Sequence, residues 1–430
     1  MVKSKKYEKL KPTDAIWFEN PNVVSQVIII GNGADLEAGL CSKYSDFYKD
    51  RYTEPLLASM DNVFTENEYL KNVTVWDLIL ARKNKDVEMT NWSDIESLIT
   101  DVLMRDSLES EDYPENLRNG WMKHSILSLL VTVGLNYTKY SIYKTILVVQ
   151  IVKILDFKYS YIEELQSRDT TDSQLFYTVT LLLKELNAYE SFFIEYLFRR
   201  SMDSNYLIKA ERLIDELIIA DLPDLEFNEI VLKNRLLNFN YTRPFGDDEE
   251  QRFYVQRNVH GSLDTNNIIF GVDELANDAE RSNPLFAFSK TYRIMSLSGE
   301  TYLGRGLLDD DVEIIKFYGH SLSAADYSYF QAMFDSVDLY SGKTELYFYF
   351  RIRDGFNEED LLQEMNLNVS LLLERYGSSN GNDVRGRNLL TKLNLESRLH
   401  VKILPKIQQY SDYVERKNYV TFDQYFIPEI

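Results

Sequence analysis

Residues 27–40, VIIIGNGADLEAGL, constrain the fold of this chain more than any other stretch. Four consecutive aliphatic residues run directly into Gly31, Asn32 and Gly33, and a short helical pattern follows and ends at Gly39. An apolar run without alternation is typical of a parallel strand that is covered on both faces. The stretch predicts a buried strand, a tight glycine turn and a helix N-terminus, which together offer backbone N–H groups to a phosphate. A single Gly-x-Gly can also be a simple connection, so the other parts of the chain must decide.

Composition excludes several classes of protein. The 430 residues are enough for two or three domains, or for one core with a large insertion. The formal net charge of −21 argues against a nucleic-acid or anionic-membrane binder, because those partners attract a positive surface. The single cysteine, Cys41, excludes an intrachain disulfide and fits a reducing cytoplasm, where we expect the protein. We expect no signal peptide, and the longest uncharged stretch, 125–138, is too short to cross a bilayer.

The secondary-structure pattern of the sequence changes twice along the chain. From about residue 54 to 232 helical periodicity dominates, most clearly in the apolar stripe from Leu175 to Leu197, with N-cap candidates at 171–173. Such a stripe indicates core packing, or else a helix–helix interface between subunits. Beyond residue 232 strand patterns return, with helical patterns between several of them. The expected strands are 236–240, 252–259, 267–272, 313–318 and 345–350, and the clearest intervening helices are 285–295 and 324–334.

Alternating strands and helices predict an α/β fold with an open, mostly parallel, Rossmann-like sheet and a large all-helical insertion. We expect residues 1–53 and 233–350 to form one split nucleotide-binding domain, with 54–232 as the insertion. Residues 351–430 form a mixed C-terminal segment, in which we expect the loop 377–386 to be mobile.

Polar clusters follow three of the later predicted strands. In open α/β sheets, ligands bind at the edge formed by the carboxyl ends of the strands. The clusters are Phe239-Asn240-Tyr241-Thr242, Val259-His260-Gly261 and Tyr318-Gly319-His320-Ser321-Leu322 with Asp326 beyond it, and the glycine turn at 31–33 makes a fourth.

Each cluster also has a purely structural interpretation. Asn240 could bond loop backbone, and His260 could be a histidine with all its partners inside a turn. Ser321 could be the N-cap of a helix that contains Asp326. The convergence argues for a site, because two of only four histidines fall beside glycine at predicted sheet edges.

Two acidic groups are harder to assign. Asp35 and Glu37 follow the glycine turn, where either could face a ribose or could simply interact with the helix N-terminus. In the segment 91–96, NWSDIE, Trp92 and Ile95 fit packing, and Asp94 with Glu96 fits pairing with cations. A role for this segment in closing the pocket is the alternative.

The motifs, taken together, resemble those of the AbiH family of bacteriophage abortive-infection proteins. The matching motifs are GNGADLEAGL, Tyr44-Ser45-Asp46-Phe47, Asn91-Trp92-Ser93-Asp94-Ile95-Glu96, Phe239-Asn240-Tyr241-Thr242, His260-Gly261, Ile269-Phe270-Gly271 and Gly319-His320-Ser321-Leu322. They occur in the family's order from residue 27 to about 350. Ala34 departs from the pattern, because the family usually has an aromatic residue there, and this bears on the shape of the pocket at the turn.

More remotely, the motif order is similar to that of sirtuin-like NAD-binding domains, some of which hydrolyse NAD+ in defence. The resemblance implies that Asn240 and His260 are catalytic and that NAD+ is the substrate, with no other cofactor and no metal. It implies that the substrate-binding residues are Gly31, Asn32, Gly33, Asp35, Tyr241, Gly261, Gly319, His320, Ser321 and Asp326. The zinc module of the deacetylases needs four cysteines, so deacetylation is not expected.

The expected reaction breaks the bond between nicotinamide and ribose. Nicotinamide leaves as a neutral base, so the protein must stabilise an oxocarbenium-like ribose and admit water. His260 would bond a ribose hydroxyl or act as base, Asn240 would orient water or ribose, and the glycine turn would hold the pyrophosphate.

The expected function is NAD+ depletion on infection, set off by a phage-encoded or host trigger, in a homo-oligomer without membrane or nucleic-acid partners. The alternative is an interaction protein that senses NAD or ADP-ribose without cleaving it. A nuclease fits less well, because of the charge and because no compact metal-ligand spacing occurs.

Overall fold

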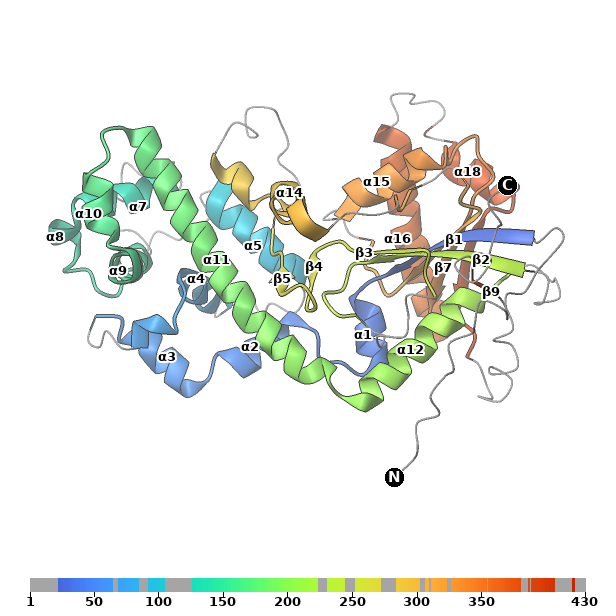
Figure 1. The fold of residues 1–430 in the computed structure, drawn as a ribbon, viewed down its shortest axis with the longest axis horizontal. Coiled ribbons are helices and arrows are strands. Elements are labelled where there is room, and N and C mark those ends of the chain that lie inside the picture. Colours follow the sequence, from blue (N-terminus) through green and yellow to red (C-terminus); the bar gives the residue numbers. More distant parts are fainter. Residues whose placement is uncertain are drawn as a thin grey trace.

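The computed structural model describes fourteen stretches of the chain, and the account below concerns these residues. They are 22–64, 69–84, 92–104, 126–222, 230–243, 252–271, 284–301, 306–308, 311–322, 326–353, 355–379, 386, 388–406 and 420–421. The predicted α/β architecture is confirmed: a parallel sheet forms one part of the molecule and a large helical region the other (Figure 1).

The sheet has the strand order β3-β2-β1-β6-β7-β8, and all its pairings are parallel. The strands are β1 (Asn22–Ile30), β2 (Ile230–Asn238), β3 (Val255–Asn258), β6 (Ile314–Tyr318), β7 (Glu345–Phe350) and β8 (Leu399–Ile403), and β9 (Val420–Thr421) pairs with β2 outside this path. In the register, Ile30 lies opposite both Asn238 and Tyr318, and Asn238 lies opposite Asn258. The central strands therefore end together, and the segments that follow them meet at one edge.

Helices cover both faces of the sheet because β1 is apolar on both sides. Val27 and Ile29 share a core with α15 (Tyr327–Ser336), α16 (Glu358–Ser379) and α18 (Leu389–Leu395). Ile28 and Ile30 face the other way and pack with α12 (Ser204–Ile219). This two-sided burial is the reason why the strand shows no alternation in the sequence.

The connection between β1 and β2 is the helical region. It begins with α1 (Asn32–Ala38), which ends at Gly39 as predicted, in the left-handed conformation with φ +95°. The further elements are α2 (Tyr44–Arg51), α3 (Glu54–Asp61), η2 (Tyr69–Lys71), α4 (Val75–Asn84), α5 (Trp92–Met104), α7 (Ile126–Leu135), α8 (Tyr137–Tyr140), α9 (Leu147–Tyr159), α10 (Tyr161–Gln166) and α11 (Thr171–Ser201), followed by α12. The long helix α11 runs from the far end of this region toward the sheet (Figure 1).

The predicted apolar stripe on α11 is buried in the core of the helical region, which confirms the packing interpretation for Val179, Leu186 and Phe193. The helix begins slightly earlier than the N-cap candidates at 171–173. Thr170 is the N-cap, and its side chain accepts a hydrogen bond from the Ser173 N–H.

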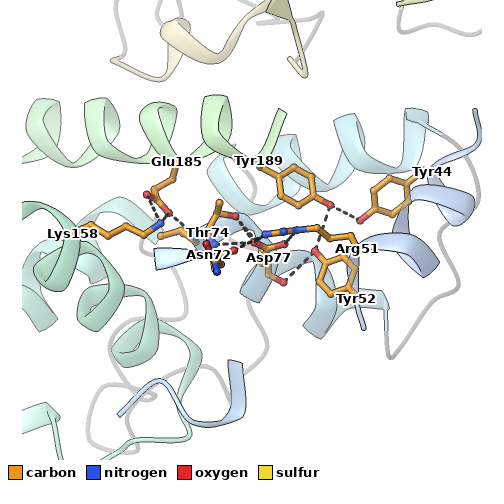
Figure 2. Close-up of polar contacts among 10 residues, drawn as sticks. Tyr44, Arg51, Tyr52, Asn72, Thr74, Asp77, Lys158, Glu185 and Tyr189 are labelled. Carbon is orange, nitrogen blue, oxygen red and sulfur yellow. Dashed lines mark hydrogen bonds and ion pairs between the residues drawn. The ribbon is translucent and has the colours of Figure 1, made fainter. Parts of the chain in front are cut away.

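Two buried carboxylates connect the helices of this region (Figure 2). Asp77 on α4 accepts hydrogen bonds from Arg51 Nε at 3.1 Å and Nη2 at 2.8 Å, and from the Thr74 N–H at 2.8 Å. Glu185 on α11 accepts from Lys158 Nζ at 3.0 Å and from the Val75 N–H at 2.9 Å. Both charges therefore have the partners that burial requires.

The strand predictions hold for β2, β3, β6 and β7 within a few residues, but the strand predicted at 267–272 is wrong. Only Asn267–Ile268 form a strand there, β5, which pairs antiparallel with β4 (Gly261–Ser262) away from the main sheet. Ile268 and Phe270 are apolar because they pack into the core of the helical region. The helix predicted at 285–295 is divided into η7 (Pro284–Phe288) and α14 (Lys290–Thr301), and the helix predicted at 324–334 is α15.

The sheet continues beyond residue 350, because β8 extends it at the β7 edge and α16 covers it. Of the loop predicted at 377–386, residues 377–379 instead form the end of α16, and residues 380–385 lie outside the described residues. Among the helices described, none has the length and apolar character needed to cross a membrane.

Candidate functional site

A cavity of about 840 Å³ opens at the edge where the central strands end. Segments that are far apart in the sequence line it. They come from the turn after β1, the loops after β2 and β3, the loop after β6, the end of β7, and helices α5, α11 and α16. Its size is within the range of pockets that bury most of a cofactor-sized ligand.

The structure brings almost all of the predicted site residues together in this cavity. The lining includes Gly31, Asn32, Gly33, Asp35, Asn240, Tyr241, His260, Gly319, His320, Ser321 and Asp326. Gly261 is the exception, because it lines a separate cavity of about 230 Å³ beside Arg243 and Asn258. Gly261 has φ +82°, and a Cβ there would lie 1.7 Å from the Asn267 carbonyl oxygen, so its place in the motif follows from the turn into β4.

The glycine turn has a different role from the predicted one. The Gly31 N–H donates to the Tyr318 carbonyl at 3.0 Å, and the Gly33 N–H donates to the Gly319 carbonyl at 2.7 Å. The prediction that these two N–H groups are open to a phosphate is therefore wrong. A Cβ on Gly33 would lie 2.6 Å from Gly319 Cα, so the glycines allow the turns after β1 and β6 to pack backbone against backbone.

Asn32, between these glycines, projects its side chain toward α2, where Asn32 Oδ1 accepts a hydrogen bond from Ser42 Oγ. Both residues line the cavity. The contact fixes the position of the turn relative to the start of the helical region.

Asn240 is the most unusual group in the cavity. Its side chain is buried, at 3% exposure, and neither Oδ1 nor Nδ2 has a hydrogen-bond partner among the described residues. The backbone around it is fully bonded: the Asn240 N–H donates to Asn238 Oδ1, and Asn258 Nδ2 donates to the Asn240 carbonyl. A buried amide costs free energy when it is left without partners, so a fixed loop with a free amide is the arrangement expected of a ligand site. The interpretation that Asn240 bonds loop backbone applies to its main chain, and not to its side chain.

His260 and His320 converge on one carboxylate. His260 Nε2 lies 3.0 Å from Asp326 Oδ1, and His320 Nε2 lies 3.2 Å from Asp326 Oδ2. The Phe239 ring contacts both imidazoles edge to face, with centroid distances of 5.7 Å and 4.5 Å. Asp326 is the N-cap residue of α15, so the prediction that Ser321 takes this position is wrong.

The partners of each ring define its protonation. His320 Nδ1 accepts a hydrogen bond from the Leu322 N–H at 2.9 Å, so the proton of its neutral form is on Nε2, facing Asp326. Burial, and then the charge of Lys290, lower the pKa of His260 and keep its ring neutral. Burial opposes the charge on Asp326, but His260, His320 and Lys290 outweigh it and hold its pKa well below the usual range.

Asp326 lies 3.0 Å from His260 Nε2 without the alignment of a hydrogen bond, and its charge favours the tautomer of neutral His260 that carries the proton on Nε2. The other ring nitrogen, Nδ1, is then the basic one. An ionised acid that orients a neutral histidine is the geometry of a general base.

Asp35 lies deeper, and both its oxygens have partners within the protein. Tyr206 donates to Oδ1 at 2.8 Å, and Thr242 donates to Oδ2 at 2.7 Å. Burial raises the pKa of Asp35 to about 6, although both hydrogen bonds act against this shift. The hydroxyl partners come from α12 and from the loop that carries Asn240, so Asp35 ties this loop to α1. Glu37 pairs instead with Arg351, at 3.2 Å.

Sequence analysis missed several residues of the cavity. Lys43, Arg351 and Arg353 bring positive charge to its rim, and Leu361, Met365 and Asn368 of α16 form one wall. The arginines directly follow the predicted strand 345–350, so the rule that ligands bind at carboxyl ends could have found them. Nothing in the pattern of α16 indicates that it faces a cavity.

Glu96 is the contribution of α5 to the cavity. Its carboxylate lies 2.9 Å from Lys290 Nζ, which confirms the predicted pairing of Glu96 with a cation. Ile95 is buried, as expected for packing. Asn91 and the side chains of Trp92 and Asp94 lie outside the described residues.

The arrangement combines a buried free amide, a neutral histidine oriented by a carboxylate, and cations at the rim. Within the described stretches, no group of three or more His, Cys, Asp or Glu side chains could hold a metal ion. The chemistry that these side chains support is hydrogen bonding and proton transfer on a polar substrate.

A family model described as bacteriophage abortive infection AbiH matches residues 27–348, which is well over half of the chain. No curated protein and no solved structure matches.

Proposed function

This chain belongs to the AbiH family of bacteriophage abortive infection proteins, and from this premise we propose that it acts by hydrolysing NAD+ to nicotinamide and ADP-ribose. Loss of NAD+ on infection would arrest the cell before phage is released. The observation that carries the proposal is the free amide of Asn240 in a cavity that also holds neutral His260. The order of motifs, which is similar to that of sirtuin-like NAD-hydrolysing domains, supports the choice of NAD+ among polar ligands.

The proposed reaction needs few groups. The bond between the ribose C1′ and nicotinamide N1 breaks, and both electrons go to the nicotinamide, which leaves as a neutral base. Water attacks C1′ and loses its proton to Nδ1 of His260. The Asn240 amide, which is both donor and acceptor, orients the water or the ribose. A positioned base contributes roughly 10²–10⁴-fold to the rate of such a step.

The remainder of NAD+ would occupy the wider part of the cavity. Since the N–H groups of Gly31 and Gly33 are engaged, we assign the pyrophosphate to the cations at the rim, Lys43, Arg351 and Arg353. Arg351 is already paired with Glu37 and Glu216. Arg353 pairs with Glu364 at 3.6 Å, but both of these side chains are more than half exposed and such pairs are weak, so Lys43 and Arg353 are the more available.

The test is to incubate the purified protein with NAD+ and to follow free nicotinamide by chromatography, with and without phage lysate. We expect turnover in at least one condition, and a loss of at least 100-fold in Asn240→Ala and in His260→Gln. The control is His400→Gln, because His400 lies on β8 beside Tyr347 and Glu345 and does not line the cavity.

Toxicity in cells should follow turnover across these variants. If Asn240→Ala and His260→Gln together remain fully toxic during infection, the cavity is not the cause of abortive infection. Recovery of intact, tightly bound NAD or ADP-ribose, with no nicotinamide released under any condition, would favour the nucleotide-sensing alternative.

A further inference from the structure

A chain of buried charges connects the helical region to the candidate catalytic histidine. Lys290, the first residue of α14, is 1% exposed, and its Nζ lies 3.0 Å from Asp326 Oδ1. On its other side, the same Nζ lies 2.9 Å from Glu96 Oε1 on α5. Asp326 in turn lies 3.0 Å from His260 Nε2. The order along the chain is Glu96, Lys290, Asp326 and His260.

The ends of this chain belong to different parts of the fold. Glu96 is on α5, whose residues Ile95, Ile99 and Val102 are buried in the core of the helical region. His260 follows β3 at the edge of the sheet. Lys290 is therefore the group through which a movement of α5 changes the charge around His260.

The backbone holds Lys290 closely in place. A Cβ added to Gly271 would lie 3.0 Å from the Phe288 carbonyl oxygen and 3.1 Å from the Lys290 nitrogen. The glycine of Ile269-Phe270-Gly271 thus lets α14 begin against the loop that follows β5. Arg293, one turn further along α14, is fixed by Glu190 of α11 and by the Phe270 carbonyl. A long cation held this firmly has a defined position in the site.

We infer that Lys290 is a positioning residue: it holds Asp326 against His260 and reports the position of α5, through Glu96, to the histidine. The inference rests on the proposed function for its consequence in catalysis. The electrostatic coupling between Lys290 and His260, however, exists in the protein without substrate.

The charges around His260 predict opposite effects for removing the charge of Lys290 and removing the charge of Glu96. The groups that face it are Asp326, Lys290, His320 and, beyond Lys290, Glu96, with the rings of Tyr241 at 6.3 Å and Tyr329 at 6.2 Å. Removing the cation should stabilise the protonated imidazole, because Asp326 then acts unopposed. Removing the charge of Glu96 should do the reverse, since the charge of Lys290 is then less compensated.

The experiment is a pH titration of the full chain with ¹³C-labelled histidine, observed by NMR. The sequence has four histidines, and His260→Gln assigns the signal of interest. For Lys290→Met we expect the midpoint of His260 to move upward by about one pH unit or more, and for Glu96→Gln to move downward. Lys290→Arg should remain close to the parent protein.

Lys316→Met is the matched control. Lys316 is also a fully buried lysine, but its Nζ bonds the Leu217 and Ile218 carbonyls at the end of α12. Its loss should lower stability without moving the midpoint of His260. If Lys290→Met does not fold, Glu96→Gln decides alone, because this substitution preserves size and hydrogen bonding. An unchanged midpoint in the folded variants overturns the inference.

Turnover of NAD+ is measured on the same variants, so that the two proposals fail separately. A shifted His260 midpoint without any turnover would support the coupling through Lys290 and contradict the proposal that the protein hydrolyses NAD+. Turnover whose acid limb follows the midpoint, upward in Lys290→Met and downward in Glu96→Gln, supports both. Turnover with an unchanged His260 midpoint would support NAD+ hydrolysis and overturn the coupling through Lys290.

Discussion

The absence of a side chain at Gly319 allows the turns after β6 and β1 to pack closely beside the cavity. This residue has φ +69°, and a Cβ on it would lie 2.5 Å from the Ala34 nitrogen and 2.8 Å from the Gly33 carbonyl carbon. A side chain there would separate the turn after β6 from the turn after β1. Because Gly31, Asn32 and His320 are all carried by these two turns, the separation would open the cavity.

For Gly319→Ala we expect a loss of about 1–2 kcal/mol for the left-handed backbone and about 1–3 kcal/mol more for the clash. The measurement is the urea midpoint of unfolding. Gly355→Ala is the control, because Gly355 has φ +85° but nothing within 4 Å of an added Cβ. Equal losses for the two variants would contradict the close packing of the turns.

The site residues that could be read from the sequence are polar residues at or just beyond the ends of predicted strands. Asn240, His260 and His320 belong to this group, and all three line the cavity. Lys290 could not be found in this way, because a lysine at the start of a helix is normally a surface residue and only the fold buries it. The sequence also could not show that the Gly31 and Gly33 N–H groups are hydrogen-bonded within the protein, because their acceptors lie almost 290 residues away in the chain.

At the scale of helices and strands, buried carboxylates hold neighbouring helices of the helical region together. Asp77 on α4 is 0% exposed and is bonded by Arg51 of α2 and by Thr74 (Figure 2). The Arg51 guanidinium also lies over the Phe192 ring of α11, at 3.6 Å. Three elements therefore meet at one charge pair.

We expect Asp77→Ala to cost about 3–5 kcal/mol in free energy of unfolding, because Arg51 is left without its counter-charge. The control is Asp50→Ala. Asp50 pairs with Arg199 and Arg200, whose side chains are 64% and 52% exposed, and such pairs contribute about 0–1 kcal/mol. Urea denaturation of both variants measures the difference. A cost for Asp77→Ala as small as that for Asp50→Ala would show that the pair does not hold α2 to α4.

Elements were predictable where periodicity and burial agree. The runs 27–30 in β1 and 346–350 in β7 are continuously apolar or aromatic because helices cover both faces of the sheet. The pattern failed at Ile268 and Phe270, which are apolar because they enter the core of the helical region. It also stopped the sheet too early, since β8 (LHVKI) is only partly buried and has a weak apolar signal.

The whole molecule is joined across its two parts by one core. The largest apolar cluster contains side chains from helices α2 to α11, from the loops at the sheet edge (Tyr241 and Phe270) and from η7 (Phe288). Glu190 of α11 receives hydrogen bonds from the Phe270 N–H and from Arg293. Apolar packing and buried polar contacts thus join the helical region to the loops at the sheet edge.

We therefore expect the helical region and the sheet to unfold together. Hydrogen exchange measured by mass spectrometry at increasing urea should give the same urea dependence for peptides from α9 and α11 as for peptides from β1 and β6. The control is the four-residue helix α8, where Thr138 and Lys139 are exposed and should exchange by local opening. A separate, earlier opening of α9 and α11 would mean that the helical region is an independent domain.

The strand order has a consequence for how the protein is made. β1 and β2 are neighbours in the sheet, yet their partners Ile30 and Asn238 are separated by the entire helical region in the chain. A ribosome therefore releases β1 long before its neighbours exist, and the last cavity wall, α16, emerges only after residue 358. No shorter nascent chain or early-terminated fragment carries a complete cavity. An unfinished copy therefore cannot have the activity proposed for the cavity.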